Sequence, residues 1–135
     1  MTNREFDALV AEMVMGWKWA TCVKVSCLFP PELYQSTVLD HPALWKEGKT
    51  GKPDYEAIQI QYGGYIIPVP DYSTDIAKAW EVVEKIKDQW PDFGITWTGN
   101  KWSVSWGMDG HGWQWVEDES ITKAICLAAL EMGNP

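Results

Sequence analysis

Three segments of the chain repeat apolar residues at the spacing of an amphipathic helix. This spacing gathers the apolar side chains on one helix face, which is then buried against the rest of the fold. The first predicted helix covers residues 3–16, the second follows the polar stretch 71–75 and ends before Pro91, and the third covers residues 119–132. The third is apolar around most of its circumference, which predicts burial on more than one side.

Between the second and third helices, apolar and small polar residues alternate with a period of two. The apolar members of this alternation are Phe93, Ile95, Trp97, Trp102, Val104 and Trp106. Residues 98–101, Thr-Gly-Asn-Lys, interrupt it with a turn sequence. We therefore predict a half-buried β-hairpin with one aromatic face and one small polar face. Beyond a second glycine-rich turn, Trp113 and Trp115 predict a third strand.

Residues 18–70 carry weaker patterns. Alternation around Val23, Val25 and Cys27 predicts one short strand, residues 46–53 predict a polar loop, and residues 57–62 and 65–67 predict one or two further strands. The order is then helix, mixed region, helix, antiparallel sheet, helix, which is an α+β fold with helices packed on a sheet. The length of 135 residues predicts a single domain over residues 1–135.

Three blocks of the chain carry a resemblance to a known family. They are Phe6–Trp19, Pro70–Ile86 and Ile121–Met132, with the tryptophan-rich hairpin between the last two. Together they resemble the phage ABA sandwich domain family of bacteriophages and prophages. The resemblance implies a three-layer α/β/α sandwich, an antiparallel sheet with helices on both sides, and a viral protein located in the host bacterial cytoplasm. Residues 20–67 match the family less well, and we interpret them as an elaboration of the domain.

The net charge of the chain limits the classes of partner that it can bind. Nineteen Asp and Glu stand against eleven Lys and Arg, for a formal net charge of −8, and Arg4 is the one arginine. Long nucleic acids are bound through clustered Lys and Arg, so we exclude them as partners. A small anion in a local pocket, imitation of a polyanion, and a merely well-hydrated surface all stay open. No apolar run approaches the roughly 20 residues of a membrane helix, so we expect a soluble protein with no membrane partner.

Catalytic, metal and cofactor motifs are not found in the sequence. Three cysteines, Cys22, Cys27 and Cys126, lack the spacing of a zinc site and fit reduced thiols. The two histidines, His41 and His111, belong to no recognisable phosphoesterase motif, and no nucleophile elbow is present. Gly48-Lys49-Thr50 resembles the end of a Walker loop whose upstream glycine is missing. We therefore expect no enzyme, no metal and no cofactor.

Two places are candidates for ligand binding. Tyr72, Ser73 and Thr74 precede the second helix, where free N–H groups suit a phosphate or carboxylate, although ordinary helix capping explains them as well. The aromatic hairpin is the other candidate, because bases stack on tryptophan and a lysine can meet a phosphate. Its candidate residues are Lys101, Trp106, His111 and Trp113. Core filling is the alternative explanation for the tryptophans.

Three hypotheses about function follow. In the first, this is a phage counter-defence protein without enzymatic activity, a homo-oligomer that binds and sequesters a small nucleotide immune signal such as a cyclic nucleotide, acting as a sponge. In the second, it is an acidic inhibitor or polyanion mimic that acts on a host defence nuclease. In the third, it is an accessory phage protein with no small ligand. A sponge is expected to have a neutral or positive pocket inside an acidic shell, and a mimic is expected to carry carboxylates in a row.

Overall fold

The computed structural model describes residues 1–56, 68–90, 92–108 and 112–132. These residues form two compact units, Thr2–Pro70 and Asp71–Pro135. The region 20–67, interpreted from the sequence as an elaboration, shares the first unit with the N-terminal helix. The strands expected at 57–62 and 65–67 lie outside the described residues. Among the described residues, no helix combines the length and the apolar character needed to cross a membrane.

Helix α1 (Asn3–Met13) opens the first unit where the apolar spacing predicts a helix. Thr2 caps it, because the Thr2 hydroxyl accepts a hydrogen bond of 3.1 Å from the Glu5 N–H. The helix is three residues shorter than expected. Gly16 adopts a left-handed φ of +80°, which a residue with a side chain rarely takes, and turns the chain into the sheet.

The first unit contains a four-stranded sheet in the order β3-β1-β2-β4. Its strands are β1 (Lys18–Cys22), β2 (Val25–Phe29), β3 (Lys46–Glu47) and β4 (Lys52–Asp54). Strands β1 and β2 form an antiparallel hairpin, and β4 pairs with β2 in parallel. The prediction of one strand through Val23 was wrong. Val23 lies in the hairpin turn with φ +58° and is 90% exposed, so two strands replace one.

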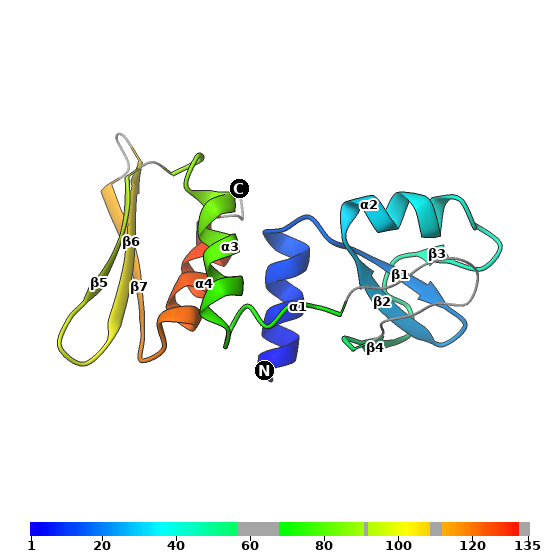
Figure 1. The fold of residues 1–135 in the computed structure, drawn as a ribbon, viewed down its shortest axis with the longest axis horizontal. Coiled ribbons are helices and arrows are strands. Elements are labelled where there is room, and N and C mark those ends of the chain that lie inside the picture. The colour runs from blue at the N-terminus through cyan, green and yellow to red at the C-terminus, as the bar shows by residue number, and fades with distance from the viewer. Residues whose placement is uncertain (57–67, 91, 109–111, 133–135) are drawn as a thin grey trace. The chain divides into compact units, whose positions relative to one another are not determined.

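Helical segments cover both faces of this sheet (Figure 1). Helix α2 (Pro31–Leu33) continues into a π-helical segment, η1 (Tyr34–Leu39), which packs on one face. The residues buried there are Ala20, Cys27, Phe29, Tyr34, Val38 and Trp45. The Phe29 and Trp45 rings meet edge to face at 5.0 Å. Because side chains alternate along a strand, Trp19 and Leu28 occupy the opposite face, toward α1.

The second unit consists of two helices and a three-stranded antiparallel sheet. The helices are α3 (Ile76–Ile86) and α4 (Ile121–Met132), and the strands are β5 (Phe93–Trp97), β6 (Trp102–Met108) and β7 (Gly112–Asp118). The predicted hairpin, its turn and the third strand are thus confirmed. Helix α4 packs on β6 and β7, and α3 packs on α4 (Figure 1).

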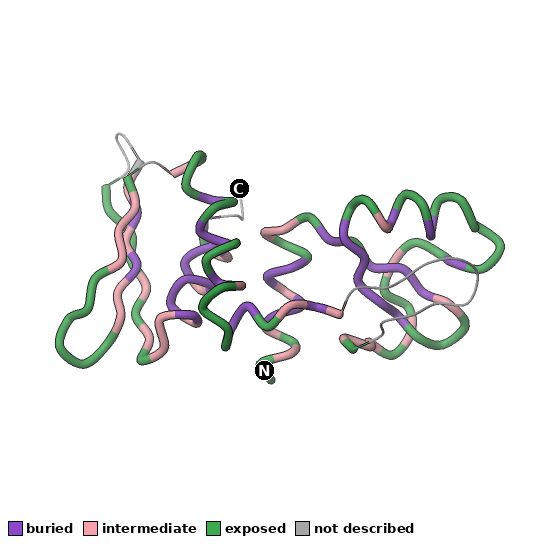
Figure 2. The backbone as a smooth tube through the Cα atoms, in the orientation of Figure 1, coloured by how far each residue is buried: buried purple, intermediate pink, exposed green. Residues whose placement is uncertain are grey.

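Burial in the second unit is concentrated on its helices (Figure 2). Helix α4 buries residues around most of its circumference, as its apolar sequence predicts. The buried residues of α3 are Ala79, Val82, Val83 and Ile86. Ile76 and Trp80, which the apolar pattern placed on the same helix face as Val83 and Ile86, are each 50% exposed. The small side chain of Ala79 takes their place in the buried face.

The α+β class is confirmed, and the strands are divided between two sheets. In the first unit helical segments cover both faces of the sheet, as the sandwich implied by the resemblance requires. In the second unit α3 and α4 lie on one side of the sheet β5-β6-β7, and no other described helix of this unit covers the opposite side (Figure 1). That uncovered side is called the outer face below.

Candidate functional site

The start of helix α3 is capped by a carboxylate of the chain itself. Asp75 is the capping residue, and its Oδ1 accepts a hydrogen bond of 2.9 Å from the Ala77 N–H. A fixed negative charge at this position opposes the binding of a second anion. The cap of helix α3 is thus Asp75, and Tyr72, Ser73 and Thr74 precede it.

The residues expected to bind a ligand before α3 serve a structural purpose. Tyr72 is 2% exposed and Ser73 is 0% exposed, so neither side chain faces solvent, while Thr74 is exposed. Thr122 of α4 donates a hydrogen bond of 2.5 Å to the Ser73 carbonyl oxygen, and Cys126 donates one of 3.4 Å to that of Tyr72. These bonds fasten the segment to α4.

The described candidate residues of the hairpin region, Lys101, Trp106 and Trp113, do not converge on one site. Trp106 pairs with Gln114, and Gly107 pairs with Trp113, so Trp106 and Trp113 lie on opposite faces of the sheet. Trp106 is 6% exposed and belongs to the core, whereas Trp113 is 59% exposed. Core filling therefore explains Trp106 but not Trp113.

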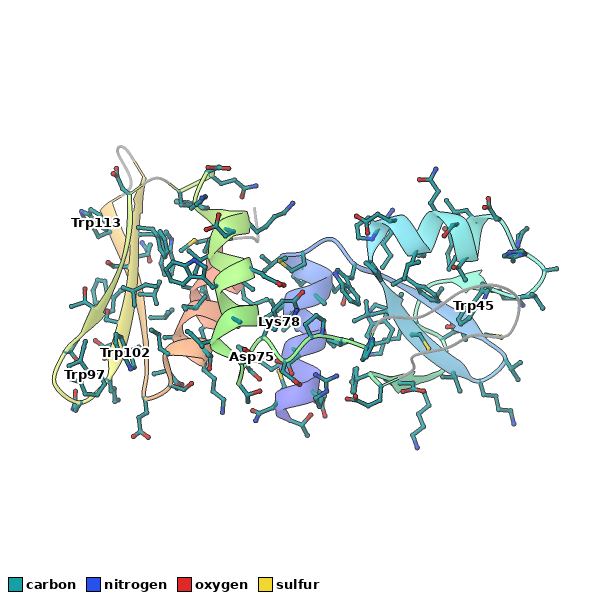
Figure 3. The ribbon with its side chains drawn as sticks, viewed as in Figure 1. Trp45, Asp75, Lys78, Trp97, Trp102 and Trp113 are labelled. Atoms are coloured by element: carbon teal, nitrogen blue, oxygen red, sulfur yellow. The ribbon has the colours of Figure 1, made fainter. Side chains whose placement is uncertain are left out.

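Lys101 is remote from Trp113 within the same sheet. It lies in the β5–β6 turn, where its carbonyl oxygen accepts a hydrogen bond of 2.9 Å from the Thr98 N–H. Strand β6 separates this turn from Trp113, roughly 20 Å at 3.3 Å per residue. Figure 3 shows Trp113 near one end of the sheet and Trp97 and Trp102 near the other. His111 lies outside the described residues.

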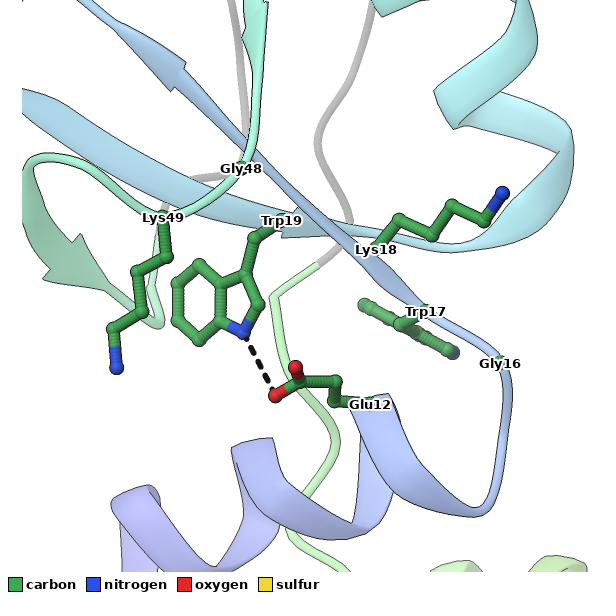
Figure 4. A pocket seen from close by; sticks show the side chains of 7 residues that line it. All are labelled: Glu12, Gly16, Trp17, Lys18, Trp19, Gly48 and Lys49. Atoms are coloured by element: carbon green, nitrogen blue, oxygen red, sulfur yellow. Dashed lines mark hydrogen bonds between the residues drawn. The ribbon is translucent and has the colours of Figure 1, made fainter.

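A pocket of about 480 Å³ lies in the first unit, between the end of α1, the start of β1 and the loop after β3 (Figure 4). It is called the Trp19 pocket below. Its lining residues are Glu12, Gly16, Trp17, Lys18, Trp19, Gly48 and Lys49. Pockets that hold small molecules commonly measure 300 to 1,000 Å³ and combine aromatic walls with a few polar groups. The Trp19 pocket meets both criteria.

Trp19 is held in place at its edge and at its face. Its indole N–H donates a hydrogen bond of 3.0 Å to Glu12 Oε2, drawn as a dashed line in Figure 4. The Lys49 ammonium lies over the ring, 4.7 Å from the centroid. Tyr55 meets the same ring edge to face at 6.3 Å. The pocket wall is therefore an oriented aromatic ring with a cation and a carboxylate beside it.

The loop that carries Lys49 is fastened to the sheet by two hydroxyls. Thr21 and Ser26 are a cross-strand pair, and their oxygens are 2.7 Å apart. The Thr21 hydroxyl donates to the Gly48 carbonyl oxygen at 2.7 Å and accepts from the Thr50 N–H at 3.1 Å. Ser26 Oγ accepts from the Gly51 N–H at 2.8 Å. Backbone groups of Gly48, Thr50 and Gly51, on both sides of Lys49, are thus bonded to the sheet.

A second lysine borders the pocket at the start of β1. The Lys18 ammonium lies 5.4 Å from the centroid of the Tyr34 ring, on the other face of the sheet, while its stem lines the pocket. Burial raises the pKa of Tyr34, and the neighbouring Glu47 carboxylate raises it further, so Tyr34 stays neutral beneath the cation. Among the described lining residues, the pocket wall therefore has the Lys49 ammonium and the Glu12 carboxylate beside Trp19, while the Lys18 ammonium lies on the other face of the sheet.

The described residues that line the pocket include no serine, cysteine or histidine that would serve as nucleophile or proton shuttle. Cys27 lies on the other face of the sheet, where burial and then the charge of Asp54 raise its pKa to about 11 and keep it a thiol. Within the described residues, no three His, Cys, Asp or Glu side chains are grouped to hold a metal ion.

The sequence pointed to this loop without identifying the pocket. Gly48-Lys49-Thr50 was noted for its likeness to a phosphate-binding loop and rejected for want of the upstream glycine. The structure supports that rejection, because the loop connects β3 to β4 and leads into no helix. What brings Lys49 to Trp19 is the pairing of β1 with β3, a contact between distant segments that no local pattern shows.

One family model and one solved structure resemble this chain over most of its length. The family model of the phage ABA sandwich domain matches residues 8–130. The crystal structure of a phage protein from Bacillus cereus ATCC 14579 is similar in fold, with a TM-score of 0.55 and 24% sequence identity. The match covers 96% of this chain and 90% of that one. No curated protein matches the chain.

Proposed function

This chain belongs to the phage ABA sandwich domain family, and on that premise we propose that it is a binding protein of a phage that captures a small nucleotide signal of host immunity in the Trp19 pocket and leaves it chemically unchanged. The observation that carries the proposal is the Lys49 ammonium, 4.7 Å from the Trp19 ring centroid at the wall of a 480 Å³ pocket. A nucleotide joins a flat base to a phosphate, and this wall offers a partner for each.

Each part of a nucleotide finds a complementary group at the pocket. Base–aromatic stacking contributes roughly 1–3 kcal/mol per base, and Trp17 and Trp19, each 8% exposed, contribute the aromatic part of the pocket lining. Lys49 is exposed and has a flexible stem, so its ammonium can move from the ring to a phosphate. Glu12 has a second oxygen free of the bond to Trp19, which can accept a hydrogen bond from a base amino group or a ribose hydroxyl.

Capture without turnover is supported by the composition of the lining. Hydrolysis of a phosphodiester requires a positioned nucleophile or metal-bound water. The lining residues that the structure describes provide neither group. A protein of this kind lowers the free concentration of its ligand by stoichiometric binding, which is the behaviour of a sponge.

The test is a thermal-shift screen of the full chain against cyclic dinucleotides and trinucleotides, cyclic ADP-ribose isomers and ordinary nucleotides. A ligand at about 100 times its Kd adds roughly 2.7 kcal/mol of stability, which raises the Tm of a domain of this size by several degrees. We expect one signal to give such a shift and to be recovered intact after denaturation. Recovery of a cleaved product would overturn capture without turnover.

Two lysine variants locate the ligand. Lys49→Ala removes the pocket cation and is expected to weaken binding at least tenfold, since charge-assisted contacts to a phosphate contribute about 1.5–3 kcal/mol. Lys52→Ala makes the same charge change at an exposed position in β4 outside the pocket, and serves as the matched control. Equal weakening by both would assign the effect to net charge. No shift with any ligand, for protein free of copurified nucleotide, would contradict the proposal.

A second candidate, an acidic inhibitor of a host nuclease, is favoured by how charge is distributed. Residues 71–135 carry eleven Asp and Glu against five Lys, while residues 1–70 carry eight against six Lys and Arg. A polyanion mimic is expected to carry carboxylates in a row, but lysines pair with two glutamates of α3. Lys78 lies 3.4 Å from Glu81, and Lys87 lies 2.6 Å from Glu84. These pairs weaken the resemblance to a polyanion and rank this function second.

A further inference from the structure

The outer face of the sheet β5-β6-β7 carries two tryptophans that no described part of the second unit covers. The face consists of Gly94, Thr96, Ser103, Ser105, Gly107, Trp113, Trp115 and Glu117. Trp113 is 59% exposed and Trp115 is 64% exposed. Exposed tryptophans are costly to hydrate, and they are enriched where proteins bind partners. Two of them at successive outward positions of one strand therefore indicate a binding surface.

Trp113 is held flat against the sheet. A Cβ added to Gly107, its cross-strand neighbour, would lie 3.2 to 3.3 Å from three atoms around the ring fusion of the Trp113 indole. Nearly equal distances to three ring atoms mean that the ring lies face-on over Gly107. The opposite π-face of the indole therefore points away from the sheet. Such a ring presents a fixed flat surface at little entropic cost.

The charge on the outer face is negative. Glu117 follows Trp113 and Trp115 on the outward side of β7 and is exposed. The described residues of this face include no lysine or arginine. The rest of the face is glycine, serine and threonine, which neither repel nor attract a charged group. An indole π-face beside a carboxylate is the environment that an arginine or lysine side chain prefers.

We propose that the outer face binds an extended, arginine- or lysine-bearing segment of a partner protein. A cationic side chain lies over the Trp113 or Trp115 ring and pairs with Glu117. Residues 71–135 carry a net excess of six carboxylates, which strengthens the long-range attraction between this unit and a cationic segment. This site is independent of the Trp19 pocket, which lies in the other unit.

The size and charge of the face favour a segment over a second copy of the chain. Three strands of five to seven residues make a surface of roughly 15 by 20 Å at the usual strand spacings. That area is well below the roughly 800 Å² per partner of a stable dimer interface. A second copy would also bring another acidic unit, and its one arginine, Arg4, is bonded to Asp7, Glu56 and the Val69 carbonyl oxygen, which leaves lysines as its cations.

The test is an NMR titration of the full chain with a short synthetic peptide of alternating arginine and glycine. The signals followed are the tryptophan indole N–H resonances, assigned by single substitutions. We expect saturable shifts of the Trp113 and Trp115 resonances. Trp115→Ala and Glu117→Gln are each expected to weaken peptide binding roughly fivefold or more, because each removes a cation–π or ion-pair contact. A peptide with glutamate in place of arginine is expected not to bind.

Matched controls separate this surface from general charge attraction. Trp97→Ala removes another exposed tryptophan that lies on the opposite face of the sheet, and Glu119→Gln removes a carboxylate outside the outer face. Both variants, and Lys49→Ala, are expected to bind the peptide like the unmodified protein. Equal weakening by Glu119→Gln and Glu117→Gln would overturn the proposal.

Two further results would also contradict a cationic segment as the occupant. One is the absence of saturable binding. The other is self-association of the peptide-free chain in sedimentation experiments that Trp115→Ala abolishes, since this would identify a second copy as the occupant. The titration contains no nucleotide, and Lys49 belongs to the other unit. Failure of the titration therefore leaves the proposed nucleotide pocket unaffected, and the reverse also holds.

Discussion

At the scale of single residues, position within a strand decides what an identical side chain does. Trp106 and Trp113 are both strand tryptophans of one sheet, yet the first is 6% exposed and the second 59%. Their register places Trp106 toward the helices and Trp113 over Gly107 on the outer face. Trp19 has a third role, as a pocket wall held by Glu12 and Lys49. Residue type alone therefore says little about which tryptophan binds.

Cys27 gives a prediction about pH. Its pKa is raised from the ordinary 9.0 to about 11, chiefly by burial. Between these two values the unfolded chain loses the thiol proton while the folded chain keeps it, so this contribution to stability is full below pH 9 and is lost as the pH rises through 11. We expect the free energy of unfolding to fall more over this interval in the unmodified protein than in Cys27→Ala, by on the order of 1–3 kcal/mol.

The measurement is denaturant unfolding of both proteins at several pH values across this interval. Tyrosines and lysines also titrate there, but they do so in both proteins, and their effect cancels in the comparison. Parallel pH profiles for the two proteins would contradict the raised pKa.

At the scale of elements, side chains fasten loops and segments that local sequence leaves unspecified. The Thr21–Ser26 pair holds the loop from Gly48 to Gly51 against the first sheet. Arg4 acts similarly in the same unit, where it bonds the Tyr55 and Val69 carbonyl oxygens at 3.2 and 2.7 Å. Each of these sets of hydrogen bonds joins residues more than twenty positions apart in the sequence. The pocket consequently depends on polar side chains that do not themselves line it.

Thr21→Val tests the fastening of the loop. Valine keeps the shape of threonine but leaves the Gly48 carbonyl oxygen and the Thr50 N–H without their partner, which is expected to cost about 1–3 kcal/mol in the free energy of unfolding. Thr96→Val, the same change at an exposed position of β5, is expected to stay within about 0.5 kcal/mol. Denaturant titration measures both values. Equal effects of the two variants would show that the hydroxyl network does not stabilise the loop.

At the scale of the whole molecule, two compact units carry different surfaces. The unit Thr2–Pro70 contains the pocket with two lysines in its lining, and Asp71–Pro135 contains the acidic surface and the outer face. Binding of a small anion and binding of a cationic segment are thereby assigned to separate units. Regions with their own cores commonly open separately from one another.

Separate opening predicts the effect of two alanine substitutions on hydrogen exchange. In Gly51→Ala the new Cβ would collide with the Lys24 carbonyl oxygen, so the backbone around it in the first unit must shift. We expect faster amide exchange in β1 and β2 with exchange in β6 and α4 unchanged. Gly99→Ala, in the β5–β6 turn with φ +102° and open space around it, is expected to loosen only the second unit.

Hydrogen exchange followed by mass spectrometry resolves these peptides in the full chain. Uniform acceleration across both units by either variant would show that the chain opens as one cooperative structure.

Short-range patterns in the sequence were sufficient for the elements that have a strong period. The apolar repeat of α3 and α4, the alternation of β5 and β6, and the Thr98–Lys101 turn each follow from neighbouring residues, because burial selects side chains at the period of the element. The resemblance to the phage ABA sandwich domain family rested on Pro70–Ile86, the tryptophan-rich hairpin and Ile121–Met132, together with Phe6–Trp19. The turn at Val23 could not be predicted, because a β-branched residue with φ +58° gives no local turn signal.

The tertiary structure decided which residues meet. The sequence suggested binding at Tyr72, Ser73 and Thr74, but the docking of α4 buries the first two, and the Asp75 carboxylate caps the helix there. The sequence also suggested one site for Lys101 and Trp113, but the length of β6 separates these two residues. The Trp19 pocket arises from strand pairing between segments nearly thirty residues apart, and the outer face arises from the register of β6 with β7. Local periodicity therefore specifies helices and strands, whereas a site depends on long-range pairing, and long-range pairing leaves no periodic trace in one sequence.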